Sequence, residues 1–171
     1  MVRIILGLFL LSVVSFSDII PRTQTLEIGG EIHHINIDRL LDLTRQIESR
    51  GGKDNYQGRY AKTSYQYELD TVQHYLSAVP ELKNYIEERL GRKLNILSEK
   101  DARYITWLVY MAKLRYHKGW LDKYYTYYLE TGDVEWLVYK VLWNSIKGKS
   151  IYKKWQQRNK ELILENCLTK L

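Results

Sequence analysis

The spacing of hydrophobic residues changes once, near the start of the chain. Residues 24–35 form two short runs that partly alternate in polarity on either side of Gly29-Gly30, the pattern of a tight β-hairpin. From Ile37 onward, apolar residues recur at every third or fourth position, which is the period of an α-helix buried on one side. The pattern therefore predicts a small N-terminal hairpin followed by helices.

Capping residues, glycines and prolines divide the helical region into segments. The first helix begins at Ile37 and ends before Gly51-Gly52, and a polar loop follows to about residue 62. We expect later helices over residues 63–78, 80–90, 98–116, 119–130, 134–146 and 149–165. The expected organisation is a signal peptide (1–17), an extension that holds the hairpin (18–36) and one mainly α domain (37–171).

The first 17 residues have the pattern of a secretory signal. Arg3 supplies a positive start, residues 4–14 are an apolar run, and Ser15 and Ser17 are small residues at the positions that signal peptidase reads. The apolar run is shorter than the roughly 20 residues that span a bilayer. We expect cleavage after Ser17, with an uncleaved anchor as the alternative. In both cases the domain is exported, to the periplasm, the cell envelope or a virion.

Composition narrows the choice of partners. The chain has a formal net charge of +6, and loss of Arg3 with the signal leaves +5, which suits an anionic wall or membrane surface. Nucleic acid is not an expected partner of an exported protein. Fifteen Tyr and five Trp suit either a groove that stacks on sugars or a tyrosine-rich core. Cys167 is the only cysteine, so the chain has no intramolecular disulfide.

Glu48 is the residue whose position is least typical of its type. At 100° per residue it falls about 20° from Ile37, in the middle of the apolar side of the first helix. Burial and the negative end of the helix dipole would both raise the pKa of a carboxyl group there. A carboxylic acid that keeps its proton near neutral pH is suited to cleave a glycosidic bond. The alternative is an ordinary carboxylate that bends outward to pair with Arg45, Arg50 or Arg59.

Three segments resemble the motifs of a known enzyme family. Residues 47–52 (Ile-Glu-Ser-Arg-Gly-Gly) resemble the Glu-Ser motif that ends the catalytic helix in lytic transglycosylases of the lysozyme-like superfamily, including those of bacteriophages. Residues 61–66 (Ala-Lys-Thr-Ser-Tyr-Gln) resemble a reduced form of the second motif. Residues 139–148 (Tyr-Lys-Val-Leu-Trp-Asn-Ser-Ile-Lys-Gly) resemble the late aromatic-Asn motif. The three motifs occur in the family's order.

The motifs also depart from the family's pattern. Thr63 and Ser64 stand where glycines usually precede the Gln, and Trp143 replaces the usual Tyr before Asn144. The Glu-Ser pair is only two residues long, so the resemblance depends on the order and spacing of all three motifs.

The resemblance implies a lysozyme-like helical domain that cleaves the MurNAc-GlcNAc bond of peptidoglycan as a lytic transglycosylase. Glu48 would be the single general acid and later the base, and attack by the sugar's own 6-hydroxyl would give a 1,6-anhydro product. No metal or cofactor is implied. A muramidase, which hydrolyses the bond, is the alternative, and Asp54 and Asp70 are the nearest candidates for its second carboxylate.

The resemblance also implies a set of residues that contact the substrate. Gln66 would hydrogen-bond the sugar, and Ser49 would orient Glu48 or the substrate. Helix periodicity places an aromatic stripe beside the Asn of the last motif, and we expect its later members to line the cleft and Trp136 to be packed. The expected substrate-binding residues are Ser49, Tyr60, Gln66, Tyr139, Trp143 and Asn144. Helix termination, a solvent-facing helix start and a capping Asn are the structural alternatives for Ser49, Gln66 and Asn144.

Other classes of function remain open from the sequence. One is a non-catalytic virion or envelope protein that binds glycan, and another is a basic helical protein on a membrane surface. The four histidines, His33, His34, His74 and His117, have no metal-binding spacing. The expected state is a monomer that acts on peptidoglycan glycan strands, with association to a membrane or virion as an open possibility.

Overall fold

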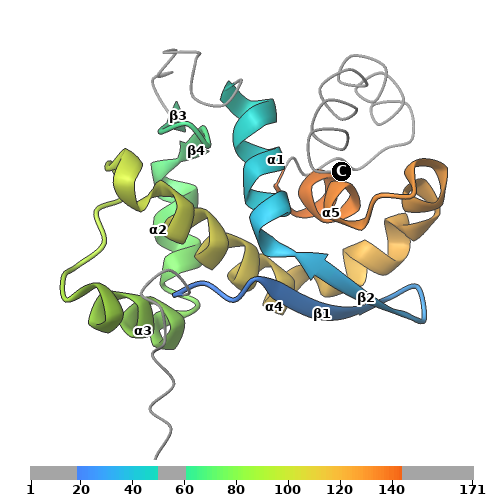
Figure 1. Cartoon of the computed structure of the whole chain (residues 1–171), viewed down its shortest axis with the longest axis horizontal. Coiled ribbons are helices and arrows are strands. Elements are labelled where there is room, and N and C mark those ends of the chain that lie inside the picture. Colours follow the sequence, from blue (N-terminus) through green and yellow to red (C-terminus); the bar gives the residue numbers. More distant parts are fainter. Residues whose placement is uncertain (1–18, 50–60, 144–171) are drawn as a thin grey trace, which may run out of the picture.

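The computed structural model describes residues 19–49 and 61–143. It confirms the predicted class, a mainly helical domain with a small N-terminal hairpin (Figure 1). Several predicted features lie outside the described residues: the signal peptide at 1–17, the Gly-Gly end of the first helix, Tyr60, Asn144 and the helix at 149–165. Within the described ranges, no helix is both long and apolar enough to cross a membrane.

The N-terminal hairpin consists of β1 (Thr23–Ile28) and β2 (Glu31–Asn36), paired antiparallel with Ile28 opposite Glu31. Both residues of its two-residue turn, Gly29 and Gly30, have positive φ, at 62° and 83°. This is the type I′ geometry that matches the twist of the flanking strands and favours glycine at both positions. The predicted hairpin is therefore confirmed.

The turn of the hairpin is held on α4 (Glu99–Thr131), the longest helix within residues 19–49 and 61–143. The Gly29 N–H donates to Asp122 Oδ1 at 2.8 Å, and the Tyr125 hydroxyl donates to Glu31 Oε2 at 2.8 Å. A Cβ added at Gly29 would lie 2.3 Å from the Tyr125 ring, whereas one at Gly30 would meet open space. The ring and the positive φ together require glycine at position 29.

We expect Gly29→Ala to destabilise the protein by roughly 3 kcal/mol. About 1–2 kcal/mol comes from the left-handed backbone and the rest from displacement of the Tyr125 ring. Gly30→Ala is the matched control, because it has the same backbone strain and no steric overlap, so we expect a loss of only about 1–2 kcal/mol. Urea denaturation of the three proteins would measure the difference, and equal losses would contradict the role given to Tyr125.

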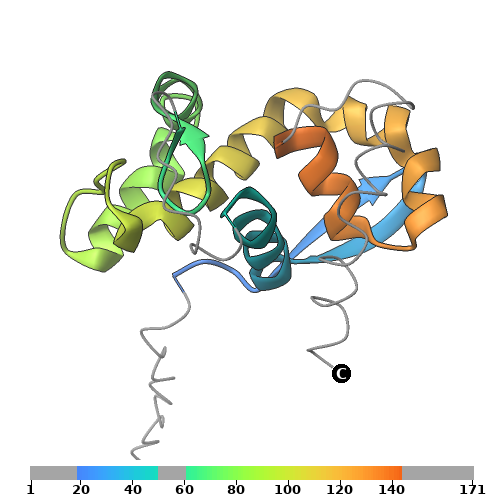
Figure 2. The ribbon, with the colours of Figure 1, turned by 90° about the horizontal axis from the view of Figure 1, so that it is seen from above.

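Most of the rest of the described domain is helical. Its helices are α1 (Ile37–Ser49), α2 (Leu69–Leu76), α3 (Pro80–Leu90), α4, α5 (Val134–Val138) and a π-helical turn, η1 (Tyr139–Trp143). Helix α1 lies between α2 on one side and α5 on the other (Figures 1 and 2). Helix α4 runs across the molecule and contacts all three. The buried sides of α1, α4 and α5 meet in the core, which includes Leu40, Leu41, Ile105, Leu108 and Leu137. This packing brings the C-terminal end of α1 into the interior.

The predicted helix start at Thr63 or Ser64 is wrong. The chain there forms a second antiparallel hairpin, β3 (Ala61–Lys62) and β4 (Tyr67–Glu68), and α2 begins only at Leu69. Thr63 and Gln66 have φ of 63° and 51°, a left-handed conformation that a right-handed helix excludes. The Gln66 N–H donates to the Thr63 carbonyl at 3.1 Å and closes the turn.

Two other helix predictions need correction. The segments expected at 98–116 and 119–130 form one element, α4, with a kink at His117, whose φ and ψ are −127° and 16°. The helix expected over 134–146 is α-helical only to Val138 and then widens into η1. The predicted N-cap is confirmed, since Asp133 accepts a hydrogen bond from the Trp136 N–H at 3.0 Å.

A cluster of charges fixes the start of α5 to the start of α1. The Arg39 guanidinium forms ion pairs with Asp133 and Glu135, whose side chains are only 7% and 5% exposed. Glu135 Oε1 also accepts the Asn36 N–H at 2.7 Å, and the Asn36 side chain accepts the Arg39 N–H at 3.0 Å. This Arg39 clamp joins α1 to the start of α5, the helix that leads into η1 (Tyr139–Trp143).

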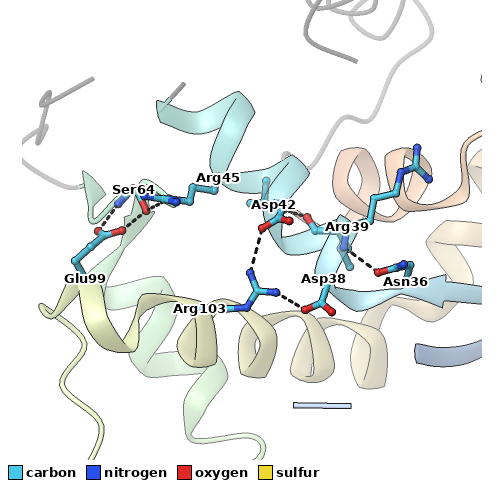
Figure 3. A network of polar contacts seen from close by, with 10 residues as sticks. Asn36, Asp38, Arg39, Asp42, Arg45, Ser64, Glu99 and Arg103 are labelled. Atoms are coloured by element: carbon cyan, nitrogen blue, oxygen red, sulfur yellow. Dashed lines mark hydrogen bonds and ion pairs between the residues drawn. The ribbon is translucent and has the colours of Figure 1, made fainter. Parts of the chain in front are cut away.

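Polar contacts also tie the exposed face of α1 to α4 and to the β3–β4 turn (Figure 3). Arg103 of α4 pairs with Asp38 and Asp42, and Arg45 Nε donates to Ser64 Oγ at 3.0 Å. Ser64 in turn donates its N–H to Glu99 at 2.8 Å. These contacts hold the β3–β4 turn beside the last turns of α1.

Candidate active site

A cavity of about 360 Å³ opens where the C-terminal end of α1 meets the β3–β4 hairpin, α2, α4 and η1. Three of the residues predicted from the sequence, Glu48, Gln66 and Trp143, line it together. The other lining residues are Tyr67, Glu68, Thr71, Val72, Val109 and Lys113. The volume is within the range of about 300–1,000 Å³ that is usual for small-ligand sites.

Glu48 lines this cavity, is half-buried and lies in the last turn of α1. Its Oε1 accepts a hydrogen bond from the Tyr139 hydroxyl at 2.6 Å. Burial raises the pKa of Glu48, and the hydrogen bond from Tyr139 and the charge of Lys140 oppose that rise. Arg45, one of its predicted alternative partners, instead bonds Ser64, and Arg50 and Arg59 lie outside the described residues. The net result is a carboxyl group that keeps its proton to higher pH than an ordinary glutamate.

Tyr139 is fully buried and reaches the cavity only through Glu48. It begins η1, whose wider turn also carries Lys140 and ends at Trp143. This position does not support the expected direct contact between Tyr139 and a substrate. Because π-helical turns are uncommon and concentrate at functional sites, their use here agrees with a site at this end of the helix.

Lys140 is a buried cation next to the proposed acid. Lys140 is only 2% exposed. Its Nζ lies 5.4 Å from the centre of the Trp136 ring and 5.5 Å from that of the Tyr139 ring. Burial lowers the pKa of Lys140 to about 6, and the charge of Glu48 opposes this shift. The ammonium form is therefore disfavoured in the folded protein.

We expect Lys140→Met to stabilise the protein by on the order of 3 kcal/mol at pH 7. The pKa of Lys140 falls from 10.5 to about 6 on folding, so the unfolded chain binds more protons between these values. The cost of burying Lys140 is thus largest below pH 6 and disappears as pH rises toward 10.5. Thermal unfolding at pH 6, 7 and 9 would show a gain that shrinks with pH.

The matched control is Lys123→Met. Lys123 is exposed, and its Nζ lies 5.6 Å from the centre of the Tyr124 ring, so the control removes a lysine–ring contact without removing a buried charge. We expect it to change stability by less than about 1 kcal/mol. A loss of stability in Lys140→Met would show instead that the ammonium group is a stabilising part of the site.

Trp143 forms one wall of the cavity. Its ring lies 5.3 Å from the Tyr110 ring and 5.4 Å from Lys113 Nζ. The Tyr110 hydroxyl is held by a buried hydrogen bond of 2.7 Å with Thr44 Oγ1 on α1. A flat, half-buried indole fixed in this way offers a surface on which a sugar ring can stack.

Gln66 and Ser49 each bond a carbonyl group of the β3–β4 turn. Gln66 lines the cavity, and its Nε2 donates to the Thr63 carbonyl at 2.9 Å, which leaves the side-chain oxygen as an acceptor. Ser49 is buried outside the cavity, and its hydroxyl bonds the Ser64 carbonyl at 2.6 Å. Ser49 therefore joins α1 to the turn, and a direct contact with substrate is not supported.

Lys113, Glu68 and Thr71 are cavity residues that the sequence reasoning missed. Lys113 lies four residues after Val109 and eight after Ile105, both buried, so the argument that identified Glu48 could have found it. Glu68 is exposed, and Thr71 Oγ1 donates to it at 3.4 Å. Of the two carboxylates considered from the sequence, Asp70 is exposed and does not line the cavity, and Asp54 lies outside the described residues.

Within residues 19–49 and 61–143, no group of three or more His, Cys, Asp or Glu side chains is arranged to hold a metal ion. No family model matches the chain, and neither a curated protein nor a solved structure shows significant similarity to it.

Proposed function

We propose that this protein is an exported lysozyme-like enzyme that cleaves peptidoglycan glycan strands, with Glu48 as its general acid. The observation that carries the proposal is the Glu48 carboxyl group: it lies in an open cavity, is half-buried, and has a pKa raised by that burial. A general acid must still hold its proton at the working pH, and burial that raises the pKa of a carboxyl group is a common way to achieve this.

The surroundings of Glu48 support a saccharide as the ligand. Trp143 offers a ring face, Gln66 offers an amide oxygen, and Thr71 offers a hydroxyl, all lining one cavity. Sugars combine apolar ring faces with many hydroxyl groups, so a cavity with one aromatic wall and several neutral hydrogen-bonding groups fits them. The resemblance of the motifs around these residues narrows the proposed saccharide to peptidoglycan.

The proposed reaction needs one carboxyl group. Glu48 donates its proton to the bridging oxygen as the bond between that oxygen and the anomeric carbon breaks. The sugar's 6-hydroxyl oxygen then bonds the anomeric carbon and gives its proton to the Glu48 carboxylate, which restores the acid. The Tyr139 hydroxyl stabilises the carboxylate between the two steps, because its hydrogen bond to Oε1 is stronger when Glu48 is charged. The products are a new chain end and a 1,6-anhydro sugar, with no water consumed.

A muramidase is the second candidate, and one observation favours it. Glu68 lines the same cavity as Glu48, so a second carboxylate is available to activate water or to stabilise the positive charge of the transition state. Glu68 is exposed and keeps an ordinary carboxylate's access to solvent. In this case water would attack the anomeric carbon and the product would be a reducing sugar.

The test is digestion of purified peptidoglycan by the full-length protein, with Glu48→Gln as the inactive control and the soluble fragments measured by mass. Anhydro fragments, about 18 Da lighter than their hydrolysed counterparts, would support the transglycosylase. Hydrolysed fragments that disappear in Glu68→Gln would support the muramidase. Absence of any fragment from folded protein would overturn the enzymatic proposal and leave a glycan-binding virion or envelope protein.

A further inference from the structure

Lys113 is a second cation in the proposed active site, and it faces the cavity. The residue is 7% exposed, lies on α4 and lines the same cavity as Glu48. Its Nζ lies 5.1 Å from the centre of the Tyr75 ring and 5.4 Å from that of Trp143. The two rings stabilise the positive charge of the ammonium group but offer no lone pair to its N–H groups.

Lys113 differs in its partners from the ion-paired residues of the described domain. Arg39 is paired with Asp133 and Glu135, and Asp101 is paired with Arg92. By contrast, no carboxylate, carbonyl or hydroxyl within residues 19–49 and 61–143 accepts a hydrogen bond from Lys113. Burial alone lowers its pKa, to about 8, so the ammonium form still predominates at pH 7.

We propose that Lys113 binds a carboxylate of the substrate and makes the cavity selective for acidic saccharides. The proposal rests on the proposed function and adds to it the charge of the group that the cavity recognises. An ammonium group held between two rings can donate hydrogen bonds to an incoming carboxylate without breaking an existing ion pair. Of the other two ionisable residues that line the cavity, Glu48 is half-buried with a pKa raised by burial, which disfavours its negative form, and Glu68 is exposed to solvent.

Peptidoglycan offers this carboxylate from two sources. Muramic acid carries one on its lactyl ether where the peptide has been removed, and the stem peptide carries others where it remains. Both sources present the same chemistry to Lys113. A neutral saccharide of the same size would bind through Trp143 and Gln66 but would leave the buried ammonium group without an acceptor, which is unfavourable.

The experiment measures affinity by calorimetry for three ligands: the disaccharide GlcNAc-MurNAc with a free lactyl carboxylate, its neutral lactyl amide, and the same disaccharide with a dipeptide stem. None contains the MurNAc-GlcNAc bond, so binding is measured without turnover. We expect wild-type protein to bind at least one acidic ligand about tenfold more tightly than the amide. In Lys113→Met this preference should fall to about one, because the acidic ligands lose the ammonium group that binds their carboxylate.

The remaining outcomes separate this proposal from the enzymatic one. A preference for the peptide-free acid identifies the lactyl group as the source of the carboxylate, and a preference for the dipeptide form identifies the stem. Equal binding of acid and amide, a preference that survives in Lys113→Met, or no binding of any of the three at millimolar concentration would overturn the role of Lys113. None of these results bears on cleavage, which the digestion of peptidoglycan decides independently. Lys123→Met, outside the cavity, should behave as wild type.

Discussion

Glu48→Gln is expected to lower the rate of glycan cleavage about 10³-fold, within the range of 10²–10⁴ typical of general acids, while the protein stays folded. Glutamine has nearly the same shape, and its side-chain oxygen can still accept the Tyr139 hydroxyl, but it has no proton to give. Removing a buried ionisable group should not reduce stability. Cleavage rates and thermal unfolding of the same preparation would separate a chemical effect from a folding effect.

The pH dependence of the wild-type protein follows from the same group. Only protonated Glu48 can act as the acid, so the rate should fall as pH rises through the raised pKa of Glu48. The folded protein also holds this proton to higher pH than the unfolded chain does. Stability should therefore fall as pH rises above the ordinary value of 4.5, and Glu48→Gln should lack that part of the dependence. A Glu48→Gln variant with more than about a tenth of the wild-type rate would remove Glu48 from the mechanism.

Arg39→Met is expected to destabilise the protein by about 3–5 kcal/mol, the usual cost of removing one partner from a buried ion pair. The side chains of Asp133 and Glu135 are 7% and 5% exposed, so the substitution would remove the Arg39 charge from two buried carboxylates. Burial raises the pKa of Glu135, so protonation of this residue would relieve part of the cost, and we expect the loss of stability in Arg39→Met to become smaller as pH falls from 7 toward 5. Chemical denaturation at both pH values would measure this.

Arg103→Met is the matched control for Arg39→Met. Arg103 also binds two carboxylates, but Asp38 and Asp42 are 53% and 49% exposed and water can replace the guanidinium (Figure 3). We expect a loss of less than about 1 kcal/mol. In the Arg39→Met background, Glu135→Gln should restore part of the stability, since the amide oxygen can still accept the Asn36 N–H. Equal losses in the two arginine variants would show that burial of the carboxylates is not the cause.

The sequence predicted those features that depend on local periodicity. The Gly29-Gly30 turn between alternating runs predicted the hairpin, and the apolar spacing from Ile37 predicted α1. The same spacing placed Glu48 on the buried side of α1, and the structure places it in a cavity with Gln66 and Trp143. In each case residues three or four apart, or two apart in a strand, carry the information.

The sequence did not predict the features that depend on tertiary contacts. Thr63 and Gln66 adopt positive φ without being glycine, because Ser64 is held by Arg45 and Glu99 and the turn is closed by Gln66 itself. The wider turn of η1 has no local signal, since its residues favour an ordinary helix equally well. The Tyr139–Glu48 contact and the Arg39 clamp each join residues more than 90 positions apart, which no sequence spacing reveals.

The links that build the cavity around Glu48 join parts of the chain that are far apart in sequence. Asn36 and Glu135 are 99 positions apart, Arg39 and Asp133 are 94, and Glu48 and Tyr139 are 91. Contacts of such long range form late in folding, because closing a long loop has an entropic cost before the contact can stabilise it. A chain still being synthesised, with residues 133–143 not yet in place, therefore carries an ordinary surface carboxylate at position 48. The proposed acid chemistry of Glu48 would begin only when residues 133–143 pack against α1.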